Sequence, residues 1–167
     1  LFIVDEVQTG VGRTGTFYSY QQFGIQPDLV SSAKGLGGGL PIGAVLFGEK
    51  TQDTLIPGDH GSTFGGNPVV CAGAVEVLNR MDDTFLQNVT AKGRHMREEI
   101  EKMPHVTSVA GMGMMLGIEL DIDVKPVVTA LMENGLLVLT AKLPPLNIAQ
   151  TELEKGLSIL KNTLAAL

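Results

Sequence analysis

The chain has 167 residues, of which 44% are hydrophobic, and this suits one compact domain or two small ones. Its formal charge is −6, and lysine and arginine are dispersed rather than gathered into the basic stripe of a nucleic-acid-binding protein. The longest apolar runs are far too short to cross a membrane, and a single cysteine excludes an internal disulfide framework. We therefore expect no nucleic-acid partner, no membrane partner, and a reducing, cytoplasmic location.

The first third of the chain alternates short apolar segments with glycine-rich loops. We expect β-strands at residues 1–4, 29–31 and 42–47, and their nearly continuous hydrophobicity is typical of a sheet covered on both faces. Because the sequence opens on such a segment without an initiator methionine, we interpret it as an interior piece of a longer protein, whose targeting cannot be read.

Helix-start signals recur along the rest of the chain. The capping residues that we assign are Asn67, Thr84, Asp123 and Thr151. The buried stripe expected on the first helix is Cys71, Ala74, Val75 and Leu78, and that on the last helix is Leu153, Leu157, Leu160 and Leu164. The helix after Asp123 is expected to end at Asn134 and Gly135. Further strands are expected at residues 106–109, 114–120 and 136–139.

These patterns predict an α/β chain in two parts, joined within residues 75–85. We expect residues 1–80 to belong to a larger domain with a mostly parallel sheet. Residues 81–167 are expected to form a smaller α+β domain.

One stretch, residues 32–39, sets a lysine among four glycines. Lys34 follows the apolar Leu29 and Val30, and glycines allow a bulky planar ligand to approach the backbone closely. A free lysine amine is protonated at neutral pH, and Schiff-base formation is its usual catalytic use. Taken alone, Lys34 is better interpreted as an ordinary solvated loop lysine.

Two further elements change that interpretation. Asp5 and Glu6 follow directly on the first strand, where ligands of open α/β sheets bind, although a cap or a solvated turn explains Asp5 equally well. Residues 60–68 combine hydroxyls, glycine amides and a helix start, as an anion site does, and an ordinary capping loop explains them nearly as well. A strand-end acid, a glycine-embedded lysine and a phosphate-type loop together fit pyridoxal phosphate, whose pyridinium nitrogen needs an acidic partner.

A different pattern, Gly10-x-Gly12-x-x-Gly15, formally matches the dinucleotide-binding fingerprint and is the basis of one alternative, a nucleotide-binding oxidoreductase. That fingerprint opens a helix and needs an acid at the far end of the next strand. Here residues 16–20 continue with aromatics and hydroxyls, and the candidate acid, Asp28, precedes its strand. We therefore predict a tight loop that holds Arg13.

Three motifs occur in order along the chain, at residues 5–15 (DEVQTGVGRTG), 33–44 (AKG and LPIGA) and 62–68 (STFGGNP). They closely resemble, in sequence and spacing, the class III aminotransferases of the ornithine/acetylornithine type. The resemblance covers the whole chain. The GTFYSYQ and LLVLTA stretches are most similar to the acetylornithine branch of that family.

The resemblance implies a fold-type I, pyridoxal-phosphate-dependent enzyme that moves the terminal amine of N-acetylornithine to 2-oxoglutarate, as in arginine biosynthesis. Lys34 would bind the cofactor as a Schiff base and shuttle a proton, and Asp5 would pair with the pyridine nitrogen. Gln8 would hydrogen-bond near the phenolic oxygen of the cofactor. Thr63, with Ser62, would reach the phosphate of the neighbouring subunit's cofactor, so the family forms homodimers with shared active sites.

Two features of the family are missing. The upstream segment with the phosphate cup and the ring-stacking aromatic is not in this sequence, so we expect residues 1–167 alone to be inactive. Members also carry an arginine just before Pro-Pro-Leu that binds a substrate carboxylate bidentately. Here Lys142-Leu143 precedes Pro144 in a shorter run, so either a loop is omitted or this clamp is lost. Arg13 is then a candidate for substrate binding, or else a structural ion-pair partner.

Other interpretations remain open at the sequence level. Members of the same family would act on ornithine, succinylornithine or 4-aminobutyrate, or as a glutamate-1-semialdehyde-type mutase, and an inactive partial domain or binding module is the non-enzyme alternative. His60, His95 and His105 lack metal-ligand spacing, so we expect no metal site. Cys71 is expected in the core, and Glu6 is expected to be a structural partner.

Overall fold

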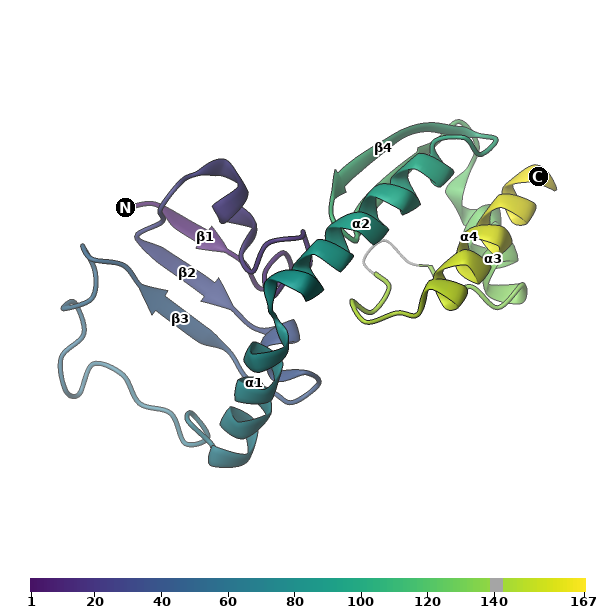
Figure 1. Ribbon diagram of the computed structural model, residues 1–167. Helices are drawn as coiled ribbons and strands as arrows, with labels where there is room; N and C mark the ends of the chain where they lie inside the picture. Colours follow the sequence, from purple (N-terminus) through teal and green to yellow (C-terminus); the bar gives the residue numbers. More distant parts are fainter. Residues whose placement is uncertain (139–142) are drawn as a thin grey trace. The chain divides into compact units, whose positions relative to one another are not determined.

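The computed structural model describes residues 1–138 and 143–167, which form two compact units, residues 1–87 and 88–167 (Figure 1). Helix α2 (Asp83–Ile100) begins in the first unit and continues in the second. The domain division that we expect after residue 80 stays a prediction. In the part of the chain that the structure describes, no helix combines the length and the apolar character that crossing a membrane requires.

The first unit contains a three-stranded sheet in the order β1-β2-β3, with β1 at Ile3–Asp5, β2 at Leu29–Ser32 and β3 at Ala44–Phe47. Strands β1 and β2 are parallel, and β3 runs antiparallel to β2. Two short 3₁₀ helices, η1 (Ser19–Phe23) and η2 (Lys34–Gly37), lie in the connections, and helix α1 (Pro68–Arg80) closes the unit.

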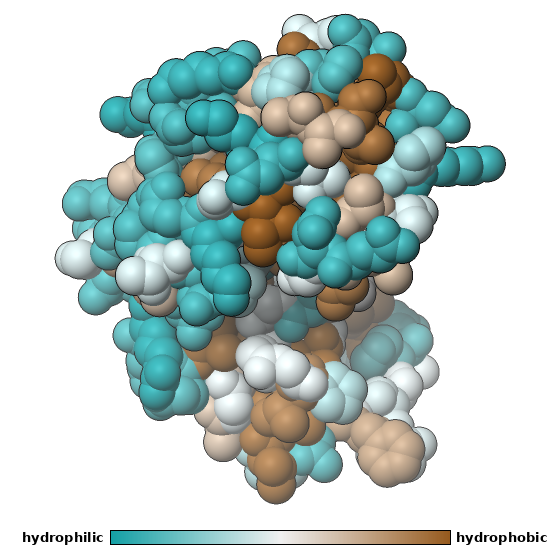
Figure 2. All heavy atoms as spheres, turned by 90° about the vertical axis from the view of Figure 1, so that its right-hand side faces the viewer, coloured by the Kyte–Doolittle hydropathy of each residue, from teal (hydrophilic) through white to brown (hydrophobic). Residues whose placement is uncertain are grey.

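The described residues leave much of this sheet uncovered, so its expected coverage on both faces stays a prediction. Ile3 is 62% exposed, and the neighbours Val45 and Leu46, which point to opposite faces of β3, are 57% and 40% exposed. Hydrophobic runs indicate that a strand is suited to burial, but they do not say which part of a protein covers it. Apolar side chains also reach the surface among hydrophilic ones on the face drawn in Figure 2.

Helix α1 is held at its start and along one side. The Asn67 carboxamide oxygen accepts hydrogen bonds from the amides of Val69 (3.0 Å) and Val70 (3.3 Å), which confirms the predicted cap. The predicted stripe is partly wrong. Ala74 is buried, but Val75 and Leu78 are 54% and 44% exposed. The residues that pack with Ala74 include Val77 and Met81, so the buried side of the helix is turned toward the η2 loop.

The second unit packs a β-hairpin and helices around one apolar core. Its elements after α2 are β4 (Val106–Met112), β5 (Met115–Leu120), α3 (Val124–Glu133) and α4 (Gln150–Ala165), and β4 pairs antiparallel with β5. The four leucines expected on the last helix are buried, together with Ile100, Met103, Val127 and Leu131. The helix and hairpin also meet at Gly93, where an added Cβ would lie 2.1 Å from the carbonyl oxygen of Gly113.

The helix-start predictions of the second half have mixed outcomes. Asp123 accepts a hydrogen bond from the Lys125 amide, as expected, and α3 ends at Asn134 with Gly135 at φ +83°. The Thr84 assignment is wrong, because the Asp82 carboxylate caps α2 through the Phe85 amide at 2.8 Å.

The Thr151 assignment is also wrong, because α4 begins one residue earlier, at Gln150, and its N-cap, Ala149, has no side-chain cap. The strand expected at 136–139 is not formed by residues 136–138, and residue 139 lies outside the described part.

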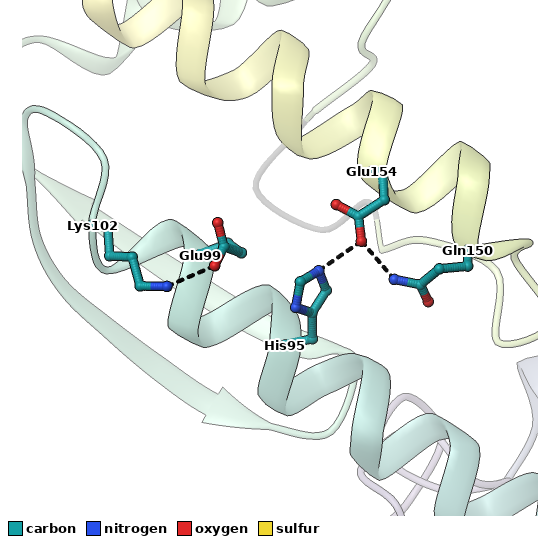
Figure 3. Close-up of polar contacts among 5 residues, drawn as sticks. All are labelled: His95, Glu99, Lys102, Gln150 and Glu154. Carbon is teal, nitrogen blue, oxygen red and sulfur yellow. Dashed lines mark hydrogen bonds and ion pairs between the residues drawn. The ribbon is translucent and has the colours of Figure 1, made fainter.

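Polar contacts join α2 to α4 on the surface of the second unit (Figure 3). The Nε2 atom of His95 lies 2.7 Å from Oε1 of Glu154, and Gln150 donates to the same oxygen at 2.6 Å. Lys102 pairs with Glu99 at 2.6 Å. The contacts of Glu154 with His95 and Gln150 use residues of the two helices themselves, so we interpret them as a structural bridge.

Candidate active site

Asp5 and Lys34 lie at the same edge of the sheet. Asp5 is the last residue of β1 and pairs directly with Ser31 of the parallel strand β2. Lys34 follows three residues later, at the start of η2. Because the carboxyl ends of parallel strands share one edge, these two exposed residues lie where α/β sheets bind ligands.

The Asp5 carboxylate is held by one of its two oxygens. Its Oδ1 accepts hydrogen bonds from the Val7 amide (2.8 Å) and from the Ser31 hydroxyl (3.1 Å). No hydrogen bond within the described residues reaches Oδ2. One oxygen of a fixed, exposed carboxylate is therefore available to a cationic group, and this fits the ring nitrogen of pyridoxal phosphate.

Lys34 has a backbone φ of +45°, a conformation that residues other than glycine rarely adopt. The turn is fixed on both sides. Leu36 is buried with Val11 and Ala74, and a Cβ on Gly35 would lie 3.2 Å from the Cβ of Val11. Val11 itself has φ at +53°, which is costly for a β-branched residue. Two strained residues in contacting loops mark this region as a functional candidate.

Glu6 is the buried centre of the loop that follows β1. It is completely inaccessible to solvent and accepts hydrogen bonds from Thr9 Oγ1 (2.6 Å), Ser19 Oγ (2.5 Å) and the Tyr20 amide (2.9 Å). Burial by itself raises the pKa of Glu6, but these hydrogen bonds together hold the pKa below its usual value. Glu6 is thus the structural partner expected from the sequence, and it ties both ends of the loop to the strand.

The same loop carries Gln8 and Arg13, which are both half-buried. Burial lowers the pKa of the Arg13 guanidinium, which nevertheless stays charged at neutral pH because arginine is not deprotonated in proteins. Their roles toward cofactor and substrate stay predictions.

Ser62 and Thr63 belong to a long exposed segment between β3 and α1 (Figure 1). Every residue from 52 to 69 is exposed, and the Ser62 hydroxyl accepts a hydrogen bond from the Gly65 amide at 2.9 Å. Within the described residues, no hydrogen bond or ion pair joins Ser62 or Thr63 to Asp5 or Lys34. The structure therefore brings Asp5 and Lys34 together, but not the third motif with them.

The local structure agrees with the prediction that the glycine pattern at residues 10–15 is not a dinucleotide-binding fingerprint. The glycine segment forms turns, and the first helical element after it is the short η1 at Ser19–Phe23. Asp28 accepts a hydrogen bond from the Phe2 amide (2.8 Å) and pairs with Lys50 (3.0 Å). The Phe2 amide and Lys50 hold the pKa of Asp28 below its usual value, so this acid has a structural role at the start of β2.

Sequence reasoning missed Ser31 and Val11 as supports of the site. A signal for Ser31 was available, because parallel pairing of two strands that each precede a candidate residue sets their ends opposite one another. The stretch before Pro144, where the family usually carries its carboxylate-binding arginine, includes residues 139–142, which lie outside the described residues.

The described residues contain no group of three or more His, Cys, Asp or Glu side chains placed to hold a metal ion. Cys71 is a free cysteine of intermediate burial. His95 and His105 contact Glu154 and Asp121 respectively, both within hydrogen-bond distance.

Comparisons with known proteins agree with this arrangement. The model of a family described as aminotransferase class-III matches residues 1–164. An acetylornithine aminotransferase from Haemophilus ducreyi is 51% identical over 172 residues, covering 99% of this chain and 44% of that protein. An acetylornithine aminotransferase from Elizabethkingia anophelis has a similar structure, with a TM-score of 0.87 and 35% identity over 100% of this chain and 48% of that one.

A second similar structure is the ornithine aminotransferase from Toxoplasma gondii, which was solved with pyridoxal phosphate at partial occupancy in its active site. Its TM-score is 0.88 at 34% identity, over 98% of this chain and 42% of that one. The chain belongs to the class-III aminotransferase family, and the expected fold-type I α/β architecture is confirmed. This membership implies pyridoxal phosphate as the cofactor. The chain spans less than half the length of these relatives.

Proposed function

We propose that the complete protein carrying this chain is a transaminase that moves the terminal amino group of N-acetylornithine to 2-oxoglutarate, a step of arginine biosynthesis. The observation that carries the proposal is that Asp5, a carboxylate with one oxygen free of hydrogen bonds in the described residues, lies at the same edge of a parallel strand pair as Lys34. The acetylornithine aminotransferases among the relatives support the choice of amine donor.

The two central residues have separate roles in this proposal. Lys34 would hold the cofactor through its side-chain amine and would move a proton at the substrate carbon. When bound, pyridoxal phosphate supplies an electron sink for the developing carbanion. Asp5 keeps the ring nitrogen protonated through its Oδ2, since a carboxylate beside a cation favours the charged form of that cation.

The remaining residues bind and orient. Gln8 donates a hydrogen bond near the phenolic oxygen of the cofactor. Arg13 faces a substrate carboxylate, which its planar fork suits. Ser62 and Thr63 reach the cofactor phosphate of a partner subunit, and the exposure of each residue from 52 to 69 supports their availability to a second chain. The protein is accordingly a homodimer with shared active sites, and it acts in the cytoplasm.

The donor assignment is tested by comparing amine donors with the purified complete protein. N-acetylornithine, ornithine, succinylornithine and 4-aminobutyrate are each supplied with 2-oxoglutarate and pyridoxal phosphate, and glutamate formation is followed. We expect the highest kcat/KM with N-acetylornithine. A higher kcat/KM with another of these donors would show that N-acetylornithine is not the preferred amine donor, although the protein would still be a transaminase. No transfer from any donor would contradict the proposed activity.

A further inference from the structure

The cross-strand contact of Asp5 depends on one side chain that the proposed chemistry does not use. Of the two hydrogen bonds to Asp5 Oδ1, that from the Val7 amide is local and is open to any aspartate in this turn. The other comes from Ser31 Oγ at 3.1 Å, across the β1–β2 pair, and depends on a hydroxyl at that position.

The adjacent Ser32 provides an internal comparison. Successive strand residues point to opposite faces, so Ser31 and Ser32 cannot both reach Asp5. Ser31 is half-exposed and donates to the carboxylate, whereas Ser32 is 1% exposed and its hydroxyl has no hydrogen-bond partner within the described residues. The two serines therefore share chemistry and sequence neighbourhood but differ in this one contact.

Ser31 also connects the two central residues of the site, because it pairs with Asp5 across the strands and lies close to Lys34 along the chain. It precedes Lys34 by three residues, and its carbonyl accepts the Glu6 amide at 2.9 Å. The same residue thus holds β1 through its backbone and the Asp5 side chain through its hydroxyl. A carboxylate held from two directions loses rotational freedom, and this loss is incurred before any ligand arrives.

We infer that Ser31 is a positioning residue for the cofactor. Its hydroxyl fixes the Asp5 carboxylate through Oδ1, so that Oδ2 stays turned to the protonated ring nitrogen of pyridoxal phosphate. This inference rests on the proposed function, because it assigns Ser31 a role in binding the cofactor of that function. Ser31 acts through Asp5 and does not itself contact the reacting atoms.

The test measures the dissociation constant of pyridoxal phosphate by equilibrium dialysis on the complete protein. Ser31→Ala is expected to weaken binding about five- to tenfold, the size of one lost intramolecular hydrogen bond. Ser31→Thr keeps the hydroxyl and is expected to bind within about twofold of the wild type. Ser32→Ala is the matched control and is expected to bind as the wild type does.

A double-mutant cycle separates positioning from general damage to the fold. In an Asp5→Asn background, Ser31→Ala is expected to weaken binding by less than about twofold further, because the carboxylate that it positions is gone. An equal loss in both backgrounds overturns the inference, as does an unchanged affinity of Ser31→Ala. If the wild-type protein does not bind pyridoxal phosphate, the proposed function fails with it, and this outcome is distinguishable from the previous two.

Discussion

Glu6 is the residue whose burial and bonding are most tightly linked to the shape of the site. Its carboxylate is completely inaccessible and collects three donors from Thr9, Ser19 and Tyr20. Asp5, one residue earlier, points to the opposite side of the strand and is exposed. Two adjacent acids therefore have opposite environments, one holding the loop and one facing the site.

Replacing Glu6 by glutamine is expected to lower the free energy of unfolding at pH 7 by roughly 2–4 kcal/mol, because hydrogen bonds to a buried charge are lost. The pKa of Glu6 is depressed in the folded protein, so its stabilisation is complete above the unfolded value of about 4.3 and is lost as pH falls through the folded value. The stability gap between variant and wild type should thus be constant from about pH 5 to 7 and shrink below about pH 4.

Urea unfolding of the complete protein, followed by circular dichroism at several pH values, measures this gap. Glu49→Gln changes an exposed carboxylate of the same unit and is the control, with little expected effect. A gap for Glu6→Gln that persists undiminished at pH 3 is incompatible with a depressed pKa.

Asp5→Asn keeps the shape of the side chain and removes its charge. We expect kcat of the complete protein to fall roughly 10²–10⁴-fold, because removing one partner of a charge pair that the bound cofactor shields from water costs about 3–5 kcal/mol. Glutamate formation at saturating donor measures the loss, and Asp83→Asn, at an exposed position at the start of α2, is the control. Near-normal turnover by Asp5→Asn would mean that this acid does not pair with the ring nitrogen.

Among the elements, the contact of α2 with the β4–β5 turn leaves no room for a side chain. A Cβ on Gly93 would meet the carbonyl oxygen of Gly113 at 2.1 Å and its carbonyl carbon at 2.4 Å, and backbone atoms cannot move aside cheaply. In Gly156 of α4, the nearest atom to an added Cβ is Leu136 Cδ1, at an ordinary 3.7 Å. Both glycines therefore have helical backbone, but only Gly156 has room for a side chain.

Gly93→Ala is expected to lower the free energy of unfolding by roughly 2–4 kcal/mol, since overpacking outweighs the helix propensity of alanine. Gly156→Ala is expected to raise it by about 0.5–1 kcal/mol. Denaturant unfolding of the two variants side by side measures both. If Gly93→Ala proves as stable as Gly156→Ala, the close approach of helix and hairpin is wrong.

The element predictions succeed where the determining contacts are local. Asn67 and Asp123 cap their helices through amides two or three residues away, so a short pattern contains all the necessary information. Thr84 fails because Asp82, two residues earlier, offers a competing cap that the capping-box pattern does not weigh. The strand expected over 136–138 does not form, although its apolar residues suited one, because strand pairing is non-local and no short pattern specifies a partner.

The candidate site, like the helices and strands, could be predicted only where short sequence patterns determine it. Asp5 and Lys34 could be found because each follows an apolar strand, and the chemistry of the residue types completed the inference. Ser31 could be found only by pairing the two predicted strands in parallel, because its contact depends on strand register. Val11 could not be found, because its contact depends on loop packing.

At the scale of the whole molecule, the first unit exposes many large apolar side chains to solvent. Ile56, Phe64 and Val69 of the segment before α1 and its first turn are 64%, 82% and 71% exposed. Exposed apolar side chains that gather on one surface indicate that another part of the protein, or another subunit, covers it. They are consistent with the proposed homodimer and with a chain that spans less than half of its relatives.

Residues 1–167 alone are expected to show no transamination, because the phosphate cup and ring-stacking residue that the family carries upstream are absent from this sequence. The purified 167-residue polypeptide is assayed with N-acetylornithine, 2-oxoglutarate and pyridoxal phosphate, beside the complete protein. Glutamate formation by the shorter polypeptide above the background without protein contradicts this expectation.

The central claim is that Lys34 binds the cofactor covalently, and chemical trapping tests it most directly. The complete protein is incubated with pyridoxal phosphate, reduced with borohydride, digested, and analysed by mass spectrometry, with Lys34→Ala and Lys50→Ala treated in parallel. We predict a reduced cofactor adduct on the peptide containing Lys34 in the wild type and in Lys50→Ala, and none in Lys34→Ala. An unmodified Lys34, or equal trapping by Lys34→Ala, would contradict the account.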